Sequence, residues 1–321
     1  MSCAARSSGP IEAQREMLDR SVERVTKTGV NHGTAWGTEQ KGCANSFDSK
    51  DTFMQSVDRA MIETELLPVL SDAEVDALAH SMDNTGIAIL RDVIPDDMLA
   101  QARSYISREL DRHGGEYFFL EGVGWVNASP LAELGRSVAF RHILKGLWER
   151  GMQRAAPDVE PRPSLRVLAG EVGLRHAGLF HYDSYVVTAL VPLVIPDGPD
   201  EPHGDLVMYP NLRRVRRSVI VNILEKAVAE SAWGRAVWRM PAVQRRFAAR
   251  AIPMQPGNIY FFWGMRSLHA NLACLPESVR STVLFHFGDP HAGGILKRLS
   301  AWRHHVKMKR LNRMPRSHNP L

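Results

Sequence analysis

The strongest restriction on the fold comes from a series of short β-rich segments that begins after Pro161 and Pro163. Glycine, proline and aspartate residues separate these segments. Short strands bounded by turn residues indicate a barrel or a jelly roll, and they argue against a sheet built from βαβ units. The predicted strands cover residues 164–169, 185–195, 204–209, 257–263 and 279–287.

Helical patterns dominate the part of the chain that precedes these strands. Ser71 and Glu74 have the spacing of a capping box, so a helix is predicted to begin there. The other elements predicted in this part are a strand over residues 86–93 and helices over residues 96–113 and 137–153. The sequence therefore predicts a mainly β fold with flanking helices.

One segment, residues 211–250, interrupts the predicted strands with a helical pattern. Two apolar rows have helical spacing, namely Val219, Ile223 and Ala227, and Ile220, Leu224 and Val228. The segment is interpreted as a helical insertion that is either a lid over a site or a packed peripheral pair of helices. Its basic row comprises Arg213, Arg214, Arg216 and Arg217. This row leads to the hypothesis of an anionic substrate or carrier, with a solvated surface as the alternative.

Composition divides the chain into three parts. Residues 1–60 are polar and are predicted to form a loosely ordered extension, residues 61–292 a single domain, and residues 293–321 a basic tail. Within the domain, residues 61–160 form the helical support and residues 161–292 the jelly-roll core. The chain has three cysteines without CxxC spacing and no apolar segment long enough for a signal peptide or a membrane span, so a soluble, cytoplasmic protein is expected.

A candidate metal site begins with His181 and Asp183, at the entry to the longest predicted strand. In an extended chain, residues i and i+2 point to the same face, so an imidazole and a carboxylate can reach one ion. Two histidines and one carboxylate on one face of an octahedron are the ligand set of non-haem ferrous oxygen chemistry. His203 and Asp205 have the same spacing and are an alternative pair, although Pro202 and Gly204 indicate a turn there.

The third ligand is expected from a later strand that returns beside the first. His269 follows the predicted strand 257–263, and His286 is its rival inside the last predicted strand. A histidine within an apolar strand is more often a buried, hydrogen-bonded group, so His269 is preferred. Arg280, eleven residues after His269, can grip a buried carboxylate with two parallel hydrogen bonds, and Thr282 has the same strand parity.

Together, the HxD motif, the segment "PGNIYFFWGMRSLH" and the "RST" eleven residues later resemble the iron(II)/2-oxoglutarate-dependent dioxygenase superfamily. The segments "GIAILRDVIPDDML" and "HGDLVMYPN" resemble its phytanoyl-CoA-dioxygenase-like branch, and the likeness extends over about residues 78–290. The resemblance implies a double-stranded β-helix (jelly-roll, cupin-like) core. It implies Fe(II) held by His181, Asp183 and His269, with 2-oxoglutarate held by Arg280 and Thr282, and O2 as oxidant.

The resemblance also narrows the reaction. Halogenating members of the superfamily replace the carboxylate ligand by a small residue, so Asp183 favours hydroxylation or a related desaturation or cyclisation. The expected substrate is a small molecule or a carrier-tethered group. The alternatives are a protein or nucleic-acid hydroxylase of the same chemistry, suggested by the basic tail, and a cupin-like binding module without turnover. No nucleic-acid-binding signature supports a nucleic-acid substrate.

Overall fold

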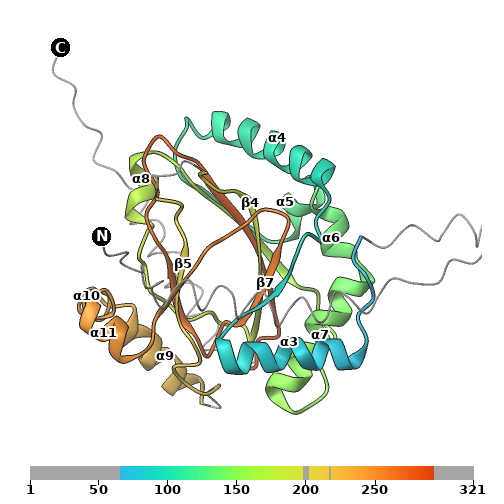
Figure 1. Cartoon of the computed structure of the whole chain (residues 1–321), viewed down its shortest axis with the longest axis vertical. Helices are drawn as coiled ribbons and strands as arrows, with labels where there is room; N and C mark the ends of the chain where they lie inside the picture. Colours follow the sequence, from blue (N-terminus) through green and yellow to red (C-terminus); the bar gives the residue numbers. More distant parts are fainter. Residues whose placement is uncertain (1–65, 198–201, 217, 293–321) are drawn as a thin grey trace, which may run out of the picture. The chain divides into compact units, whose positions relative to one another are not determined.

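Two antiparallel sheets pack face to face in the computed structural model, which describes residues 66–197, 202–216 and 218–292 (Figure 1). All described residues belong to one unit, Thr64–Leu321. The predicted extension, residues 1–60, and the predicted tail, residues 293–321, lie outside the described residues. The domain boundaries proposed from composition stay predictions.

The larger sheet contains six strands. These are β1 (Ala88–Leu90), β2 (Phe118–Glu121), β3 (Arg162–Leu168), β4 (Val187–Val194), β7 (Ile259–Trp263) and β9 (Arg280–Phe287). Their order is β1-β7-β4-β9-β3-β2, and every neighbouring pair is antiparallel. The smaller sheet has the order β6-β5-β8, made of β5 (Leu206–Tyr209), β6 (Arg250–Ile252) and β8 (Leu268–Asn271). This is a jelly-roll core, as the sequence predicts.

Strand alternation gives the large sheet two buried faces of different kinds. On β9, Val283, Phe285 and Phe287 point to the face covered by helices. Arg280 and Thr282 point to the opposite face, toward the smaller sheet, together with Leu284, which packs against an apolar cluster formed by both sheets. The space between the sheets is therefore apolar in one part and polar in another.

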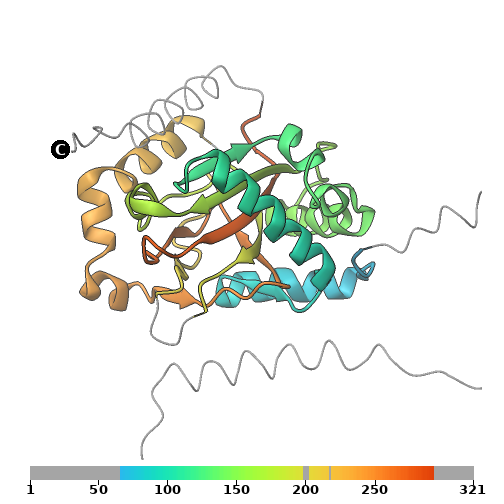
Figure 2. The same ribbon diagram turned by 90° about the horizontal axis from the view of Figure 1, so that it is seen from above.

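Helices from the first half of the chain cover the outer face of the large sheet (Figure 2). They are α3 (Asp72–Thr85), α4 (Asp96–Arg112), α5 (Val123–Asn127), α6 (Ala132–Arg136) and α7 (Val138–Met152). The predicted capping box is confirmed, because Ser71 N donates to Glu74 Oε2 at 2.8 Å and Glu74 N donates to Ser71 Oγ at 3.4 Å. A short helix, α8 (Gly170–Arg175), links β3 to the HxD segment.

The predicted insertion is helical. It contains α9 (Val219–Ala229), α10 (Ala232–Trp238) and α11 (Pro241–Arg246). Tyr209 and Ala270 of the small sheet pack with Ala229 and Trp238 of the insertion, on the sheet face that points away from the large sheet. Figures 1 and 2 place these gold helices on the opposite side of the strands from α7. The insertion therefore packs against the small sheet, which agrees with the interpretation as packed peripheral helices.

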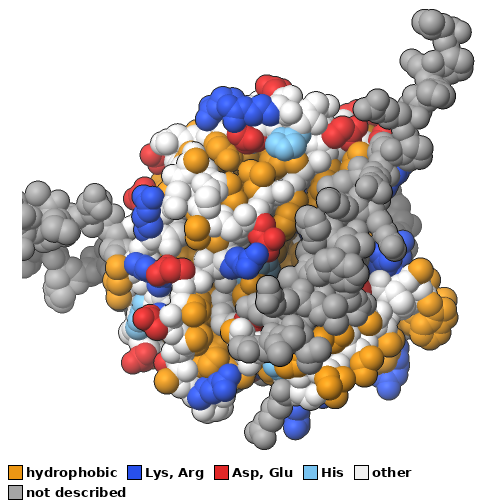
Figure 3. All heavy atoms as spheres, turned by 180° about the vertical axis from the view of Figure 1, so that it is seen from behind, with side chains coloured by type: hydrophobic (Ala, Val, Ile, Leu, Met, Phe, Trp, Pro, Cys, Tyr) orange, Lys and Arg blue, Asp and Glu red, His pale blue; other side chains and the backbone are white. Residues whose placement is uncertain are grey.

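One of the two apolar rows of α9 faces solvent. Ile220, Leu224 and Val228 are 61%, 60% and 62% exposed, whereas the polar Asn222 is buried. Figure 3, seen from behind, shows hydrophobic and basic side chains gathered at the lower right, where α9–α11 lie. Among the described residues, no helix combines the length and the apolar character needed to cross a membrane.

Candidate metal centre

The backbone brings His181 and His269 side by side. His181 lies in the extended segment before β4, and His269 lies in β8. Each backbone N–H donates to the carbonyl of the other residue at 3.0 Å, which forms an isolated antiparallel bridge. Directly paired residues of an antiparallel bridge point to the same face, so the two imidazoles meet with ring centroids 4.4 Å apart.

Asp183 completes a group of three potential ligands. Its Oδ1 atom lies 3.6 Å from Nε2 of His181 and 3.6 Å from Nε2 of His269. All three ligand atoms lie within 4.8 Å of one another. Tyr182, between the two motif residues, packs with the insertion on the other side. The expected i, i+2 alternation is therefore present, and the structure brings His181, Asp183 and His269 together.

Both imidazoles are oriented by their second nitrogen. Nδ1 of His181 donates to the carbonyl of Leu179 at 2.8 Å, and Nδ1 of His269 donates to that of Ser267 at 3.1 Å. These bonds assign the tautomers and leave both Nε2 atoms as acceptors. Nε2 of His269 is buried and has no hydrogen-bond partner. A buried acceptor without a donor is costly, and a divalent cation at this point would satisfy it.

The protonation states also fit a cation. Burial, and next the neighbouring His269, hold the pKa of His181 well below its usual range, so this imidazole is neutral. Burial acts to raise the pKa of Asp183, but the imidazoles of His269, His286 and His181 and a hydrogen bond from Thr188 outweigh it and keep the pKa below its ordinary value. A carboxylate with two imidazoles is a donor set that binds ferrous iron.

The second oxygen of Asp183 is held by groups that the sequence analysis did not single out. Thr188 Oγ1 donates to Oδ2 at 2.6 Å, and the Asp183 N–H donates to the carbonyl of Gly264 at 2.9 Å. A methyl group on Gly264 would lie 2.5 Å from Thr188 Oγ1 and 2.6 Å from Asp183 Oδ2. The carboxylate orientation therefore depends on Thr188 and on the missing side chain of Gly264. Strand parity from Asp183 does not identify Thr188, because the segment between them is irregular.

His286, the rival third ligand, lies behind the carboxylate. Its Nδ1 is 3.7 Å from Asp183 Oδ2 and 3.2 Å from Thr188 Oγ1, whereas the three ligand atoms converge near Oδ1. Burial lowers the pKa of His286. The second HxD pair is also outside the group of three ligands: His203 forms a β-bridge with Cys274, and Asp205 lies near Arg280.

Arg280 is buried between the sheets, with only 2% of its surface exposed. Its guanidinium forms no ion pair among the described residues, and its Nε atom has no hydrogen-bond partner. Burial lowers the pKa of Arg280 to about 10, and the charge of Arg166 adds to this effect. Gly204 packs on the side chain, since a methyl group there would lie 2.4 Å from Arg280 Cδ. Thr282 is also buried and shares the inner face of β9.

The basic row of the insertion is partly neutralised inside the protein. Arg213 donates to Glu225 Oε2 at 2.8 Å, Arg216 donates to the same oxygen at 2.9 Å, and Arg213 also stacks on the ring of Tyr182 at 3.9 Å. Arg214 is exposed, and Arg217 lies outside the described residues. Two of the four charges behind the anionic-substrate hypothesis are thus engaged in internal ion pairs.

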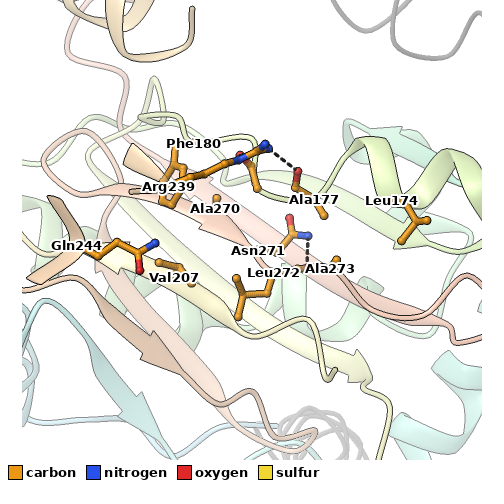
Figure 4. A pocket seen from close by; sticks show the side chains of 11 residues that line it. Leu174, Ala177, Phe180, Val207, Arg239, Gln244, Ala270, Asn271, Leu272 and Ala273 are labelled. Atoms are coloured by element: carbon orange, nitrogen blue, oxygen red, sulfur yellow. Dashed lines mark hydrogen bonds between the residues drawn. The ribbon is translucent and has the colours of Figure 1, made fainter. Parts of the chain in front are cut away.

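A pocket of about 400 Å³ lies on the far side of β8 (Figure 4). Ala270 and Val207 line its sheet wall, and Arg239 of the insertion donates to the carbonyl of Ala177 across its edge. Because Ala270 alternates with His269, its side chain lies on the opposite face of β8 from the candidate ligands. None of the three candidate ligands lines this pocket.

A jelly roll with a candidate His-Asp-His metal site is the class of protein that the described residues define. No family model matches the chain, and no curated protein matches it.

Solved structures similar in fold include a prolyl-4-hydroxylase from Pseudomonas putida, at 12% identity over 67% of this chain and 98% of that one, with a TM-score of 0.41. The non-haem alpha-ketoglutarate-dependent epimerase SnoN from nogalamycin biosynthesis is 12% identical over 78% of this chain and 93% of its own, with a TM-score of 0.42. HygX from Streptomyces hygroscopicus, with nickel and 2-oxoglutarate bound, is 13% identical over 66% of this chain and 86% of its own, with a TM-score of 0.44. These likenesses concern the fold alone.

Proposed function

We propose that this chain is an iron(II)/2-oxoglutarate-dependent oxygenase that hydroxylates a small molecule or a carrier-bound metabolite. One observation carries the proposal: three ligand atoms of the right chemistry lie within 4.8 Å of one another in a jelly roll that also buries an unpaired arginine. The sequence resemblance of the segment GIAILRDVIPDDML supports a place in the phytanoyl-CoA-dioxygenase-like branch. The cytoplasmic location stays a prediction.

Each side chain has a defined task in this proposal. His181, Asp183 and His269 would hold the iron, which supplies oxygen activation coupled to decarboxylation of 2-oxoglutarate. Leu179 and Ser267 carbonyls fix the imidazole tautomers, and Thr188 fixes the carboxylate. Arg280 and Thr282 would bind the distal carboxylate of 2-oxoglutarate. A dry site excludes water from this pairing and so strengthens it.

The direct test is metal-dependent turnover by the full chain. Purified protein loaded with Fe(II) without oxygen should form succinate from 2-oxoglutarate only after oxygen is admitted. His181→Ala should abolish succinate formation and metal retention, whereas Arg280→Met should retain metal and raise the KM for 2-oxoglutarate roughly tenfold to a hundredfold. Arg141→Met, at a half-exposed arginine on α7 paired with Glu160, is the matched control with unchanged kinetics.

A second experiment addresses the substrate. Metabolite extracts incubated with wild-type protein should yield a product that gains one oxygen or loses two hydrogens, and His181→Ala should not form it. Tight iron binding without succinate formation under any condition would instead favour a binding module and would contradict the proposed activity.

A further inference from the structure

A second guanidinium reaches the candidate site from β3. Arg166 pairs in register with Thr282 of β9, and Leu168 pairs with Arg280. Cross-strand partners point to the same face, so Arg166, Thr282 and Arg280 all face the interior between the two sheets. Arg166 crosses this interior, because its Nη1 atom donates to Oδ1 of Asn271 on β8 at 3.4 Å.

Part of the hydrogen-bonding capacity of Arg166 is unused. Its Nε atom is buried without a partner, as is that of Arg280, and neither guanidinium forms an ion pair among the described residues. Asp205 acts on Arg280 through its charge without an ion pair between them. Buried donors without acceptors are costly, and two like charges in one enclosed space add to the cost. An anionic ligand would accept hydrogen bonds from the unpaired donors and would offset the repulsion between the two positive charges.

The register of the large sheet places Arg166 between Arg280 and the candidate metal centre. Its partner Thr282 lies on β9 between Arg280 and His286. His286 marks the metal end, because its Nδ1 atom is 3.7 Å from Asp183 Oδ2. Residues two apart on a strand lie roughly 7 Å apart, which is comparable to the length of a five-carbon dicarboxylate.

We propose that Arg166 binds the carboxylate at the metal end of a dicarboxylate co-substrate whose distal carboxylate is bound by Arg280. Asn271 positions the guanidinium of Arg166, because it accepts one of its hydrogen bonds. This inference rests on the proposed function, since it takes 2-oxoglutarate as the ligand. The two guanidinium groups lie on different strands, Arg166 on β3 and Arg280 on β9. The contribution of each group to binding one end of the ligand can therefore be tested separately.

Binding without turnover provides the test. The full chain is loaded with nickel(II) in place of iron, and affinity is measured by calorimetry for 2-oxoglutarate and for 2-oxobutyrate, which lacks the distal carboxylate. Arg166→Met should weaken both ligands by a similar factor, roughly tenfold to a hundredfold. Arg280→Met should weaken 2-oxoglutarate by a comparable factor and leave 2-oxobutyrate unchanged. Arg141→Met should bind both ligands like the wild type.

Thermal unfolding provides an independent readout. Arg166→Met removes one of two like charges that have no countercharge. The melting temperature of the ligand-free variant should therefore equal or exceed that of the wild type. The rise in melting temperature that 2-oxoglutarate causes should be smaller in Arg166→Met than in the wild type. If Arg166→Met does not fold, Arg166→Lys keeps the charge but loses the planar fork, and it should still weaken both ligands.

The outcomes separate the two proposals. Failure of nickel-loaded wild type to bind 2-oxoglutarate would contradict the proposed function and remove the basis of this inference. Wild-type binding of 2-oxoglutarate with unchanged affinity in Arg166→Met would overturn the role of Arg166 alone. If Arg166→Met weakens the binding of 2-oxoglutarate but binds 2-oxobutyrate normally, the placement of Arg166 at the metal end would be overturned.

Discussion

At the scale of single residues, the carboxylate of Asp183 depends on a position without a side chain. Gly264 lies so close to Asp183 and Thr188 that a methyl group would approach both oxygens to within 2.6 Å. Such a contact forces the threonine or the carboxylate to move. Since outer partners of a ligand typically change metal affinity tenfold to a hundredfold, the displacement should reach the metal.

We therefore expect Gly264→Ala to weaken iron(II) or nickel(II) binding by roughly tenfold or more. Its free energy of unfolding should fall by about 1–3 kcal/mol, because a close-packed contact is overfilled. Calorimetric metal titration and urea unfolding measure the two effects. Gly124→Ala is the matched control, because nothing lies within 4 Å of the added methyl group. Wild-type metal affinity in Gly264→Ala would show that Thr188 does not orient the ligand.

Local alternation predicts one part of the candidate site. The i, i+2 rule places His181 and Asp183 on one face, whereas His269 and Arg280 were chosen by the resemblance to the dioxygenase superfamily, and the roles of these residues stay proposals. Thr188 and Arg166 could not be found in this way, because their roles arise from pairing between strands far apart in the sequence. The choice of His269 over His286 agrees with the geometry, and its role as a ligand stays a proposal.

At the scale of elements, periodicity predicts that a helix forms but does not predict which of its faces packs against the rest of the protein. The insertion is helical, yet the apolar row Ile220, Leu224 and Val228 faces solvent while Asn222 is buried. Asn222 is turned inward because its Oδ1 accepts a hydrogen bond at 2.8 Å from Arg213, which itself is buried. The strands β2, β6 and β8, of three or four residues each, were not predicted, because so few residues do not show an alternating pattern. The equally short β1 and β5 were found because they lie within longer predicted strands, residues 86–93 and 204–209.

The link between the insertion and the metal motif gives an element-scale prediction. Glu225 binds Arg213, whose guanidinium stacks on Tyr182 between the two motif ligands. Glu225→Gln should leave Arg213 without its countercharge, lower the free energy of unfolding by about 1–3 kcal/mol and weaken metal binding modestly. Glu133→Gln, at an exposed glutamate on α6, is the matched control.

The same ion pairs predict a pH dependence. The hydrogen bond from Arg216, opposed by burial and reinforced by Arg213, holds the pKa of Glu225 below its ordinary value of 4.5. A lowered folded-state pKa means that the stabilisation is complete above the unfolded-state value and is lost as the pH falls through the folded-state value. The stability difference between wild type and Glu225→Gln should therefore shrink in acid. A difference that is constant from neutral pH into acid would show that Glu225 acts without its charge.

At the scale of the whole molecule, the interior between the sheets combines an apolar cluster with a polar end. Leu190, Met208 and Phe262 pack in the apolar part, while Asp183 and Arg280 are buried in the polar part. Charged groups buried without partners reduce the stability of the ligand-free protein. Binding of a cation by the carboxylate and of an anion by the arginines would remove this cost, so ligands should stabilise the folded state strongly.

The last prediction follows from this linkage. A ligand present at a hundred times its dissociation constant adds about 2.7 kcal/mol to the free energy of unfolding, which corresponds to roughly 5–10 °C in melting temperature for a domain of this size. Nickel(II) and 2-oxoglutarate should therefore raise the melting temperature in two separate steps. His181→Ala should show neither rise in melting temperature, because 2-oxoglutarate is bound partly through the metal. Arg280→Met should keep the rise caused by nickel(II) and lose most of the rise caused by 2-oxoglutarate. A full second step in Arg280→Met would show that the buried arginine does not bind the co-substrate.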